Sequence, residues 1–179
     1  VADDWPFAYE DLEPYYDFID IEMGVSGLGG DPAYPPGSAP PLPPLPIGKL
    51  GRKAAEGMNA LGWHWWPGTQ AIASRPYRGR SQCTRRATCM LGCPEQAKAS
   101  TDLTHWPAAI AHGARLVTGA RVREVTLDAK GRANGAVYID REGREHYQPA
   151  RIVLVCCNGV GTPRLLRLSA GGRHPNGLA

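Results

Sequence analysis

Three cysteines lie close together near the middle of the 179-residue chain, Cys83, Cys89 and Cys93, in the pattern C-x5-C-x3-C. Three thiolates from one loop suit an iron-sulfur cluster, and the neighbouring Arg85 and Arg86 would favour the deprotonated ligands. A tetrahedral zinc site would need a fourth ligand, for which the sequence offers only distant histidines. A disulfide with one free thiol, or three buried thiols, also fits the spacing, and these interpretations stay open at this point.

The other reactive side chains carry weaker signals. The adjacent pair Cys156-Cys157 follows an apolar run and is typical of small residues in tight strand packing. His64 and His105 could each act as a general base, but lone histidines are more often packed or surface residues. We therefore assign no catalytic residue from the histidines.

Composition limits the classes of function. A hydrophobic fraction of 42% with 5 Trp supplies enough apolar material for a core, and the tryptophans around His64 are interpreted first as core and second as a carbohydrate platform. The net charge is only +3, so no nucleic-acid-binding stripe is expected. The basic residues gather only in a weak patch of five arginines: Arg75, Arg78, Arg80, Arg85 and Arg86.

A proline-rich segment at residues 24–48 divides the elements of the first half. It holds eight prolines between Pro32 and Pro46, and proline can neither donate a ladder hydrogen bond nor sit easily inside a helix. We expect an extended segment, either a linker or a strap laid over a larger body. Apolar spacing with glycine stops predicts helices over 9–23, 49–61 and 101–112, with Gly24, Gly62 and Gly113 as their ends.

The last third changes to the two-residue period of strands. Strands are predicted over 115–118, 122–128, 134–140 and 144–147, and Lys130-Gly131 and Glu142-Gly143 provide turns, so we expect an antiparallel meander. The apolar run 152–156 predicts a strand buried on both faces. It leads through a glycine turn into a helix for which Thr162 is the expected cap and Pro163 the first residue. This order of elements can receive a nucleotide, although a G-x-G-x-x-G fingerprint in the required context is absent from the sequence.

Taken together, these segments resemble the glucose-methanol-choline family of flavin oxidoreductases, in particular its gluconate, sorbitol, fructose and glucose dehydrogenases. The matching residues are DWPFAYEDLEPYYD at 4–17, MGVSG at 23–27, LGWHWWP at 61–67, AIASRPYRGRSQC at 71–83, GCPEQAKAST at 92–101, GRANGAVYIDREG at 131–143 and CNGVGTPRLLRLSA at 157–170. The last is similar to the second signature of the family, with departures at Asn158-Gly159 and at Ala170.

The resemblance implies a fold and cofactor contacts. The fold would be α/β, part of an FAD-binding Rossmann-like domain with a β-meander, joined to helices and a proline-rich strap toward the substrate domain. The strand around Val122 and the loop at Cys157, Asn158 and Gly159 would approach FAD. Residues 1–113, with the strap at 24–48 and the cysteine loop at 83–93, would bridge the flavin and substrate domains, and residues 114–179 would belong to the flavin domain.

The resemblance also implies an activity for the longer enzyme of which this chain would be an internal part. Such enzymes oxidise the CH-OH group of a sugar, polyol or sugar acid. Some carry a 3Fe-4S cluster on a C-x5-C-x3-C loop, which would fall on Cys83, Cys89 and Cys93, and pass electrons to a cytochrome c subunit with a small subunit also present. A periplasmic, membrane-associated location would follow. The catalytic histidine and the FAD phosphate loop of the family have no counterpart in this chain, and a cluster-free alcohol oxidoreductase or a non-catalytic electron-transfer module remain alternatives.

Overall fold

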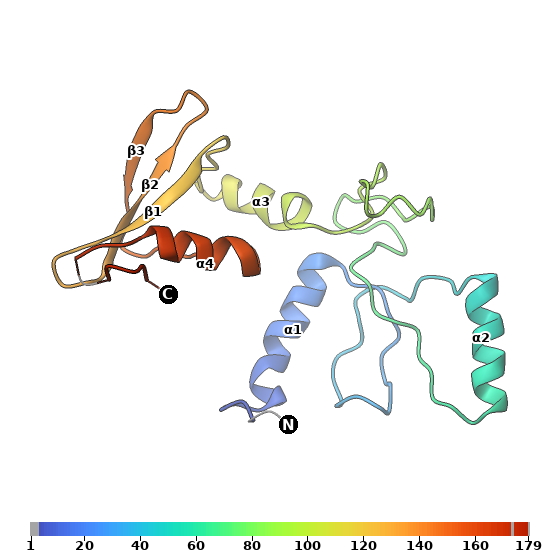
Figure 1. Ribbon diagram of the computed structural model, residues 1–179. Helices are drawn as coiled ribbons and strands as arrows, with labels where there is room; N and C mark the ends of the chain where they lie inside the picture. The colour runs from blue at the N-terminus through green and yellow to red at the C-terminus, as the bar shows by residue number, and fades with distance from the viewer. Residues whose placement is uncertain (1–3, 173, 179) are drawn as a thin grey trace. The chain divides into compact units, whose positions relative to one another are not determined.

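Four helices and a three-stranded sheet make up the regular structure of the residues that the computed structural model describes, 4–172 and 174–178 (Figure 1). The chain divides after Ala114 into two units, which we call unit 1, up to residue 114, and unit 2, from residue 115. This confirms the expected mixture of helices with an antiparallel meander. Among the described residues, no helix is long and apolar enough to cross a membrane.

Unit 1 contains α1 (Tyr9–Met23), α2 (Lys49–Ala60) and α3 (Thr101–Ala111), so all three predicted helices are confirmed. Helix α1 ends at Gly24, which adopts the left-handed conformation with φ +63°. Helix α2 is capped by Leu61, one residue earlier than expected, and the left-handed Gly62 follows it.

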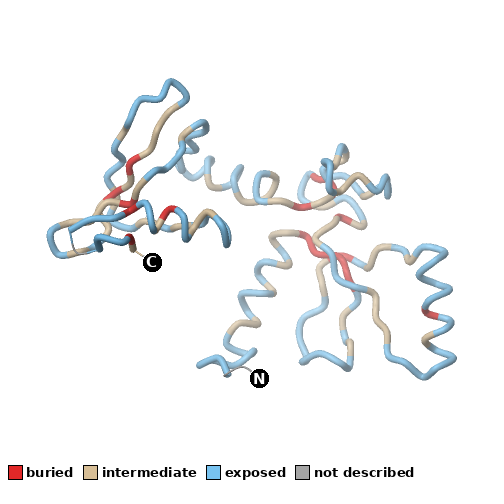
Figure 2. The backbone as a smooth tube through the Cα atoms, in the orientation of Figure 1, coloured by how far each residue is buried: buried red, intermediate tan, exposed pale blue. Residues whose placement is uncertain are grey.

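The proline-rich strap, residues 24–48, forms neither helix nor strand and folds back on the start of its own segment. Ser26 and Gln70 exchange two backbone hydrogen bonds of 2.8 and 2.9 Å, and the Leu42 N–H donates to the Val25 carbonyl. Leu42 is thereby buried against Ala73 and Ala97, which form the small core of unit 1. Figure 2 shows buried stretches of this unit where these segments cross, with a separate one on α2.

Unit 2 is a meander of β1 (Arg121–Leu127), β2 (Ala133–Ile139) and β3 (Glu145–Pro149), followed by α4 (Asn158–Leu168). Both strand pairs are antiparallel, and the left-handed Gly131 and Gly143 lie in the expected turns. Helix α4 packs on β1, and its Leu165 is buried, as are Val125 of β1 and Val137 of β2.

Three sequence predictions in unit 2 are wrong. Residues 115–118 and 152–156 are not strands. A buried strand needs partners for its backbone, and the described residues offer 152–156 none, so the side chains of Ile152 and Leu154 are 77% and 83% exposed. Helix α4 begins at Asn158, well before Thr162, because the Asn158 Oδ1 accepts the N–H groups of residues 160 and 161, as a capping side chain does.

The buried Ser169 joins the end of α4 to the edge of the sheet. Its Oγ donates to the Leu165 carbonyl at 2.8 Å and accepts the N–H of Val125 at 2.9 Å. Replacement of Ser169 by alanine leaves this buried N–H without an acceptor, so we expect unit 2 to lose about 1–3 kcal/mol of stability. Urea denaturation would measure the loss, and hydrogen exchange would report weaker protection of the Val125 amide. Unchanged protection of that amide would contradict the prediction.

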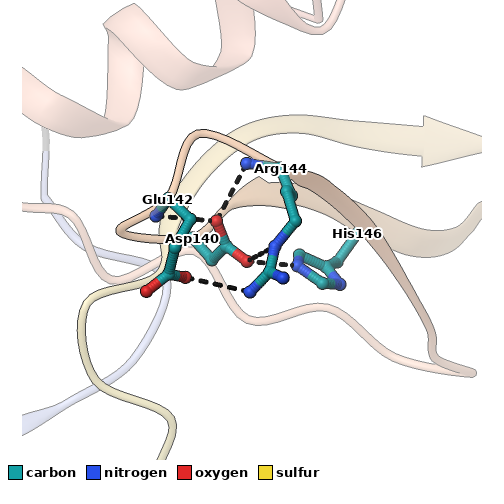
Figure 3. Close-up of polar contacts among 4 residues, drawn as sticks. All are labelled: Asp140, Glu142, Arg144 and His146. Carbon is teal, nitrogen blue, oxygen red and sulfur yellow. Dashed lines mark hydrogen bonds and ion pairs between the residues drawn. The ribbon is translucent and has the colours of Figure 1, made fainter.

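The turn between β2 and β3 is held by one carboxylate (Figure 3). The Asp140 Oδ1 accepts the N–H groups of Glu142 and Arg144, and its Oδ2 accepts His146 Nε2 at 2.7 Å and Arg144 Nε at 3.0 Å. These hydrogen bonds, that of His146 above all, hold the pKa of Asp140 well below its ordinary value.

This depressed pKa predicts a loss of stability in acid. The contribution of Asp140 is complete above the pKa of about 3.9 that an unfolded aspartate has, and it declines as the pH falls from there toward the lower folded pKa. Urea midpoints measured between about pH 5 and pH 3 should therefore fall more steeply for the wild type than for Asp140→Asn. Asp128 lies in the turn between β1 and β2, where its carboxylate is bonded to Arg132 and to backbone N–H groups. Asp128→Asn should reduce the dependence of the urea midpoint on pH less than Asp140→Asn does. Equal slopes for the wild type and Asp140→Asn would contradict the prediction.

Candidate functional site

The three clustered cysteines lie on a loop that is anchored at both ends to the core of unit 1. Cys83 and Cys93 are half-buried against that core, and the Cys83 N–H donates to the Ala73 carbonyl at 2.9 Å. Cys89 is also half-buried, and Lys98 Nζ donates to its carbonyl at 3.1 Å. All three thiols are free, so the described structure does not contain the disulfide considered above.

Charged side chains brace the cysteine loop across its base. Arg86 Nε forms an ion pair with Glu95 at 2.5 Å, and Thr84 Oγ1 donates to the same carboxylate at 2.9 Å. The hydrogen bond from Thr84, with those from the Glu95 backbone and Arg86, lowers the pKa of Glu95. One of the two arginines expected to support thiolates is therefore engaged with a carboxylate.

The structure does not gather the three thiols into a metal site. Within the described residues, no group of three His, Cys, Asp or Glu side chains is placed to hold a metal ion. Met90 and Leu91, between Cys89 and Cys93, are 92% and 93% exposed, so the loop there is covered by no other described part of the chain. As it stands, the arrangement does not fit a cluster with three cysteine ligands.

The residues predicted to approach a flavin lie at the starts of β1 and α4. Val122 is the second residue of β1, opposite Tyr138 of β2, and its side chain is 42% exposed. Cys157, Asn158 and Gly159 are all exposed. Asn158 has φ +58° and caps the helix through its own side chain, and a Cβ added at Gly159 would meet open space. The backbone at Gly159 is thus accessible at the start of α4, whereas the N–H groups of residues 160 and 161 are taken by Asn158.

The histidines singled out by the sequence both have partners. His64 Nε2 lies 2.7 Å from the Asp31 carboxylate, and His105 Nδ1 lies 2.8 Å from Thr104 Oγ1. Sequence reasoning missed Asp31, because 33 positions separate it from His64 and local spacing carries no signal for such a pair.

The tryptophans around His64 are not core residues, which corrects the first interpretation of them. Trp63 is 63% exposed, and Trp65 and Trp66 are half-buried. The indole N–H of Trp65 donates to Asn59 Oδ1, and that of Trp66 donates to the Leu28 carbonyl, each at 2.8 Å. The group therefore joins α2 and the strap instead of filling the interior.

Comparison with known proteins places these features in context. The family model described as GMC oxidoreductase matches residues 51–179. The 2-methyl-1,2-propanediol dehydrogenase of Mycolicibacterium austroafricanum is 47% identical over 98% of this chain and 32% of its own length. The fructose dehydrogenase large subunit of Gluconobacter japonicus is 35% identical over 100% of this chain and 33% of its own length. The 6'''-hydroxyparomomycin C oxidase of Streptomyces lividus is 32% identical over 97% of this chain and 32% of its own length. The chain thus spans about a third of the length of these relatives.

Proposed function

The chain belongs to the GMC oxidoreductase family, and from this premise we propose that it forms part of an FAD-dependent oxidoreductase that acts on the CH-OH group of a sugar, polyol or sugar acid. The observation that carries the proposal is the 47% identity to a diol dehydrogenase along almost the entire chain. The three relatives are named for a diol, a sugar and an aminoglycoside. The compounds in these names share hydroxyl groups on a carbon skeleton.

In this proposal, residues 114–179 contribute to flavin binding and residues 1–113 bridge toward the substrate domain. Val122 and the segment Cys157 to Gly159 would hold the adenine end of FAD, and their exposure fits that role. When bound, the flavin would accept the hydride from the alcohol carbon. The part of this chain is to position the cofactor: Asn158 fixes the first turn of α4, and Gly159 keeps its backbone open to a ligand.

Flavin affinity tests the proposal. The protein, expressed with the sequence that flanks this chain in its gene, should purify with bound FAD. Asn158→Ala removes the capping side chain, worth about 1 kcal/mol, and should weaken FAD binding roughly three- to tenfold in calorimetric titrations. Asn134→Ala is the matched control, because it also removes one side-chain acceptor, that of Thr126 Oγ1, within unit 2.

Two results would contradict the proposal. One is a folded protein that neither retains nor takes up FAD. The other is an equal loss of FAD affinity in the two asparagine variants, which would mark Asn158 as a residue that only stabilises the fold. The flanking sequence itself gives a further check, since we expect it to supply a G-x-G-x-x-G loop and a late histidine.

A second, finer proposal concerns electron exit. We propose that Cys83, Cys89 and Cys93 bind a 3Fe-4S cluster in the mature enzyme. In this proposal a cytochrome c subunit accepts electrons from the cluster, and a small subunit is also part of the enzyme. The C-x5-C-x3-C spacing supports it, as does similarity to a protein named as a large subunit. Because the described thiols do not form a metal site, Cys89 and its exposed neighbours would have to move.

Iron content decides between this proposal and a cluster-free enzyme. After anaerobic purification, the wild type should contain iron and sulfide and show a cluster signal in electron paramagnetic resonance, and Cys89→Ser should lose both. Cys156→Ser, at an exposed cysteine outside the loop, should lose neither. A wild type that binds FAD but holds no iron would favour the cluster-free alternative.

A further inference from the structure

Unit 1 contains a cavity that the proposed function does not use. It measures about 790 Å³ and lies between the strap and the tryptophan-rich loop that follows α2. The side chains on which its chemistry depends are those of Tyr9, Asp20, Asp31, Tyr34, His64 and Trp66. A volume of this size is within the range of pockets that bind small molecules.

His64 and Asp31 both line the cavity and are bonded to each other. The carboxylate accepts both His64 Nε2 at 2.7 Å and the Ala33 N–H at 2.9 Å, and its side chain is only 12% exposed. Because a carboxylate can only accept, Nε2 carries a proton, and Nδ1 is left to bond a ligand hydroxyl group, which can both donate and accept. The imidazole is therefore held in one orientation with Nδ1 available to a ligand.

An aromatic surface lies beside the His64 ring. The Trp66 ring stacks on the His64 ring with centroids 6.2 Å apart and planes 20° apart. The Trp66 N–H is bonded to the Leu28 carbonyl, which fixes the indole against the strap. Tyr9 and Tyr34 add two amphipathic side chains with hydroxyl groups that can donate or accept.

The second carboxylate, Asp20, has no hydrogen bond to another described residue, whereas Asp31 accepts two. Burial, and secondly the charge of Asp17, raises the pKa of Asp20. A half-buried acceptor of this kind gains when a ligand supplies a hydroxyl donor, because the donor replaces water that partial burial has removed. Asp20 and His64 Nδ1 thus offer two hydrogen-bonding groups in one cavity.

The charges of the cavity select the class of ligand. The described residues that line it include two aspartates and no lysine or arginine, so an anionic ligand such as a phosphate or a sugar acid would be repelled. A metal ion is not favoured either, since no group of three suitable ligands occurs among the described residues. Several hydroxyl groups on a carbon chain match both the hydrogen-bonding groups and the aromatic faces.

We propose that this cavity binds a neutral polyhydroxy compound, with its hydroxyl groups bonded to His64 Nδ1 and to the Asp20 carboxylate and its carbon chain lying against Trp66. The proposed flavin contacts, Val122 and Cys157 to Gly159, all belong to unit 2, so this site in unit 1 goes beyond the proposed oxidoreductase function. It would hold a neutral polyol or sugar as a subsite of unit 1.

Titration with two matched probes tests the proposal. Calorimetry of the protein expressed with its flanking sequence should show saturable binding of sorbitol, and gluconate, which has a similar carbon chain but carries a negative charge, should bind at least about fivefold more weakly. His64→Ala should weaken sorbitol binding at least about fivefold by removing a hydrogen-bonding group and part of the stacked surface. His112→Ala, at an exposed histidine that does not line the cavity, should bind sorbitol as the wild type does.

A second variant keeps the test decisive if His64→Ala disturbs folding. Asp20→Asn changes a side chain for which the structure gives no hydrogen bond among the described residues, and it should also weaken sorbitol binding. The proposal is overturned if folded wild-type protein shows no saturable sorbitol binding, if gluconate binds as tightly, or if both variants bind sorbitol normally. FAD affinity is measured on the same preparations to separate the two proposals. Loss of sorbitol binding with normal FAD binding would overturn this proposal alone, and loss of FAD binding with normal sorbitol binding would overturn only the proposed function.

Discussion

Replacement of Arg80 by methionine is expected to lower the free energy of unfolding of unit 1 by about 2–4 kcal/mol. Arg80 is 6% exposed, and its guanidinium donates to the carbonyl of Met23 at 2.5 Å and to that of Ala97 at 3.4 Å. It also lies over the Tyr77 ring, 6.0 Å from the centroid. Methionine keeps much of the volume but leaves both carbonyls without this donor.

The position of Arg80 explains why one side chain matters so much. Met23 is the last residue of α1, so its carbonyl has no partner within the helix, and Ala97 belongs to the small core that also contacts Cys83 and Cys93. Arg80 therefore joins the end of α1 to the base of the cysteine loop. Burial of the guanidinium lowers the pKa of Arg80, yet an arginine remains charged, so its hydrogen bonds are charge-assisted.

Arg78→Met is the matched control for this prediction. Arg78 also lies over the Tyr77 ring, at 5.6 Å, but it is exposed and pairs with Glu22 at 2.6 Å. Exposed ion pairs contribute between about 0 and 1 kcal/mol, so urea denaturation should show a much smaller loss for Arg78→Met. Similar losses for the two variants would show that burial of Arg80 does not determine its contribution.

The helices and strands that depend on residues close together in the sequence could be predicted. Helix α1 was predictable with both of its bounds, because its stop is a glycine that can adopt φ +63°. The meander was predictable because its turns contain glycine between stretches of alternating residues. Arg80, in contrast, was placed in a weak basic patch, since arginine is rarely buried and nothing nearby in the sequence marks it as a capping residue.

Features that depend on distant partners could not be predicted. The run 152–156 has the composition of a buried strand, but composition cannot supply the neighbouring strands that would bury it. The pairing of His64 with Asp31 depends on how the strap folds, and the cavity beside it depends on that same fold. The assignments of Val122, Cys157, Asn158 and Gly159 to FAD come from family resemblance. That of the three clustered cysteines to a metal comes from their spacing together with the resemblance, and all of these stay predictions.

Replacement of Gly24 by alanine should destabilise unit 1 by about 2–5 kcal/mol, through two separate costs. Gly24 has φ +63° and ψ 58°, a conformation that costs a residue with a Cβ about 1 kcal/mol or more. The added Cβ would also collide with Arg80 Nη2 and approach the Tyr77 Cδ1 atom to 2.5 Å. Relief of the collision would move the two side chains that cap the end of α1, since Tyr77 Oη donates to the Ile21 carbonyl.

Gly62→Ala separates the two costs. Gly62 follows α2 with nearly the same φ, +68°, but a Cβ added there would meet nothing within 4 Å. Gly62→Ala should therefore show only the conformational cost of about 1 kcal/mol, and the difference between the two variants in urea denaturation measures the crowding at Gly24. In the double variant Gly24→Ala/Arg80→Met the collision with the guanidinium is gone, so the two losses should sum to more than the loss of the double variant. Strictly additive losses would show that Gly24 and Arg80 do not form one packed junction.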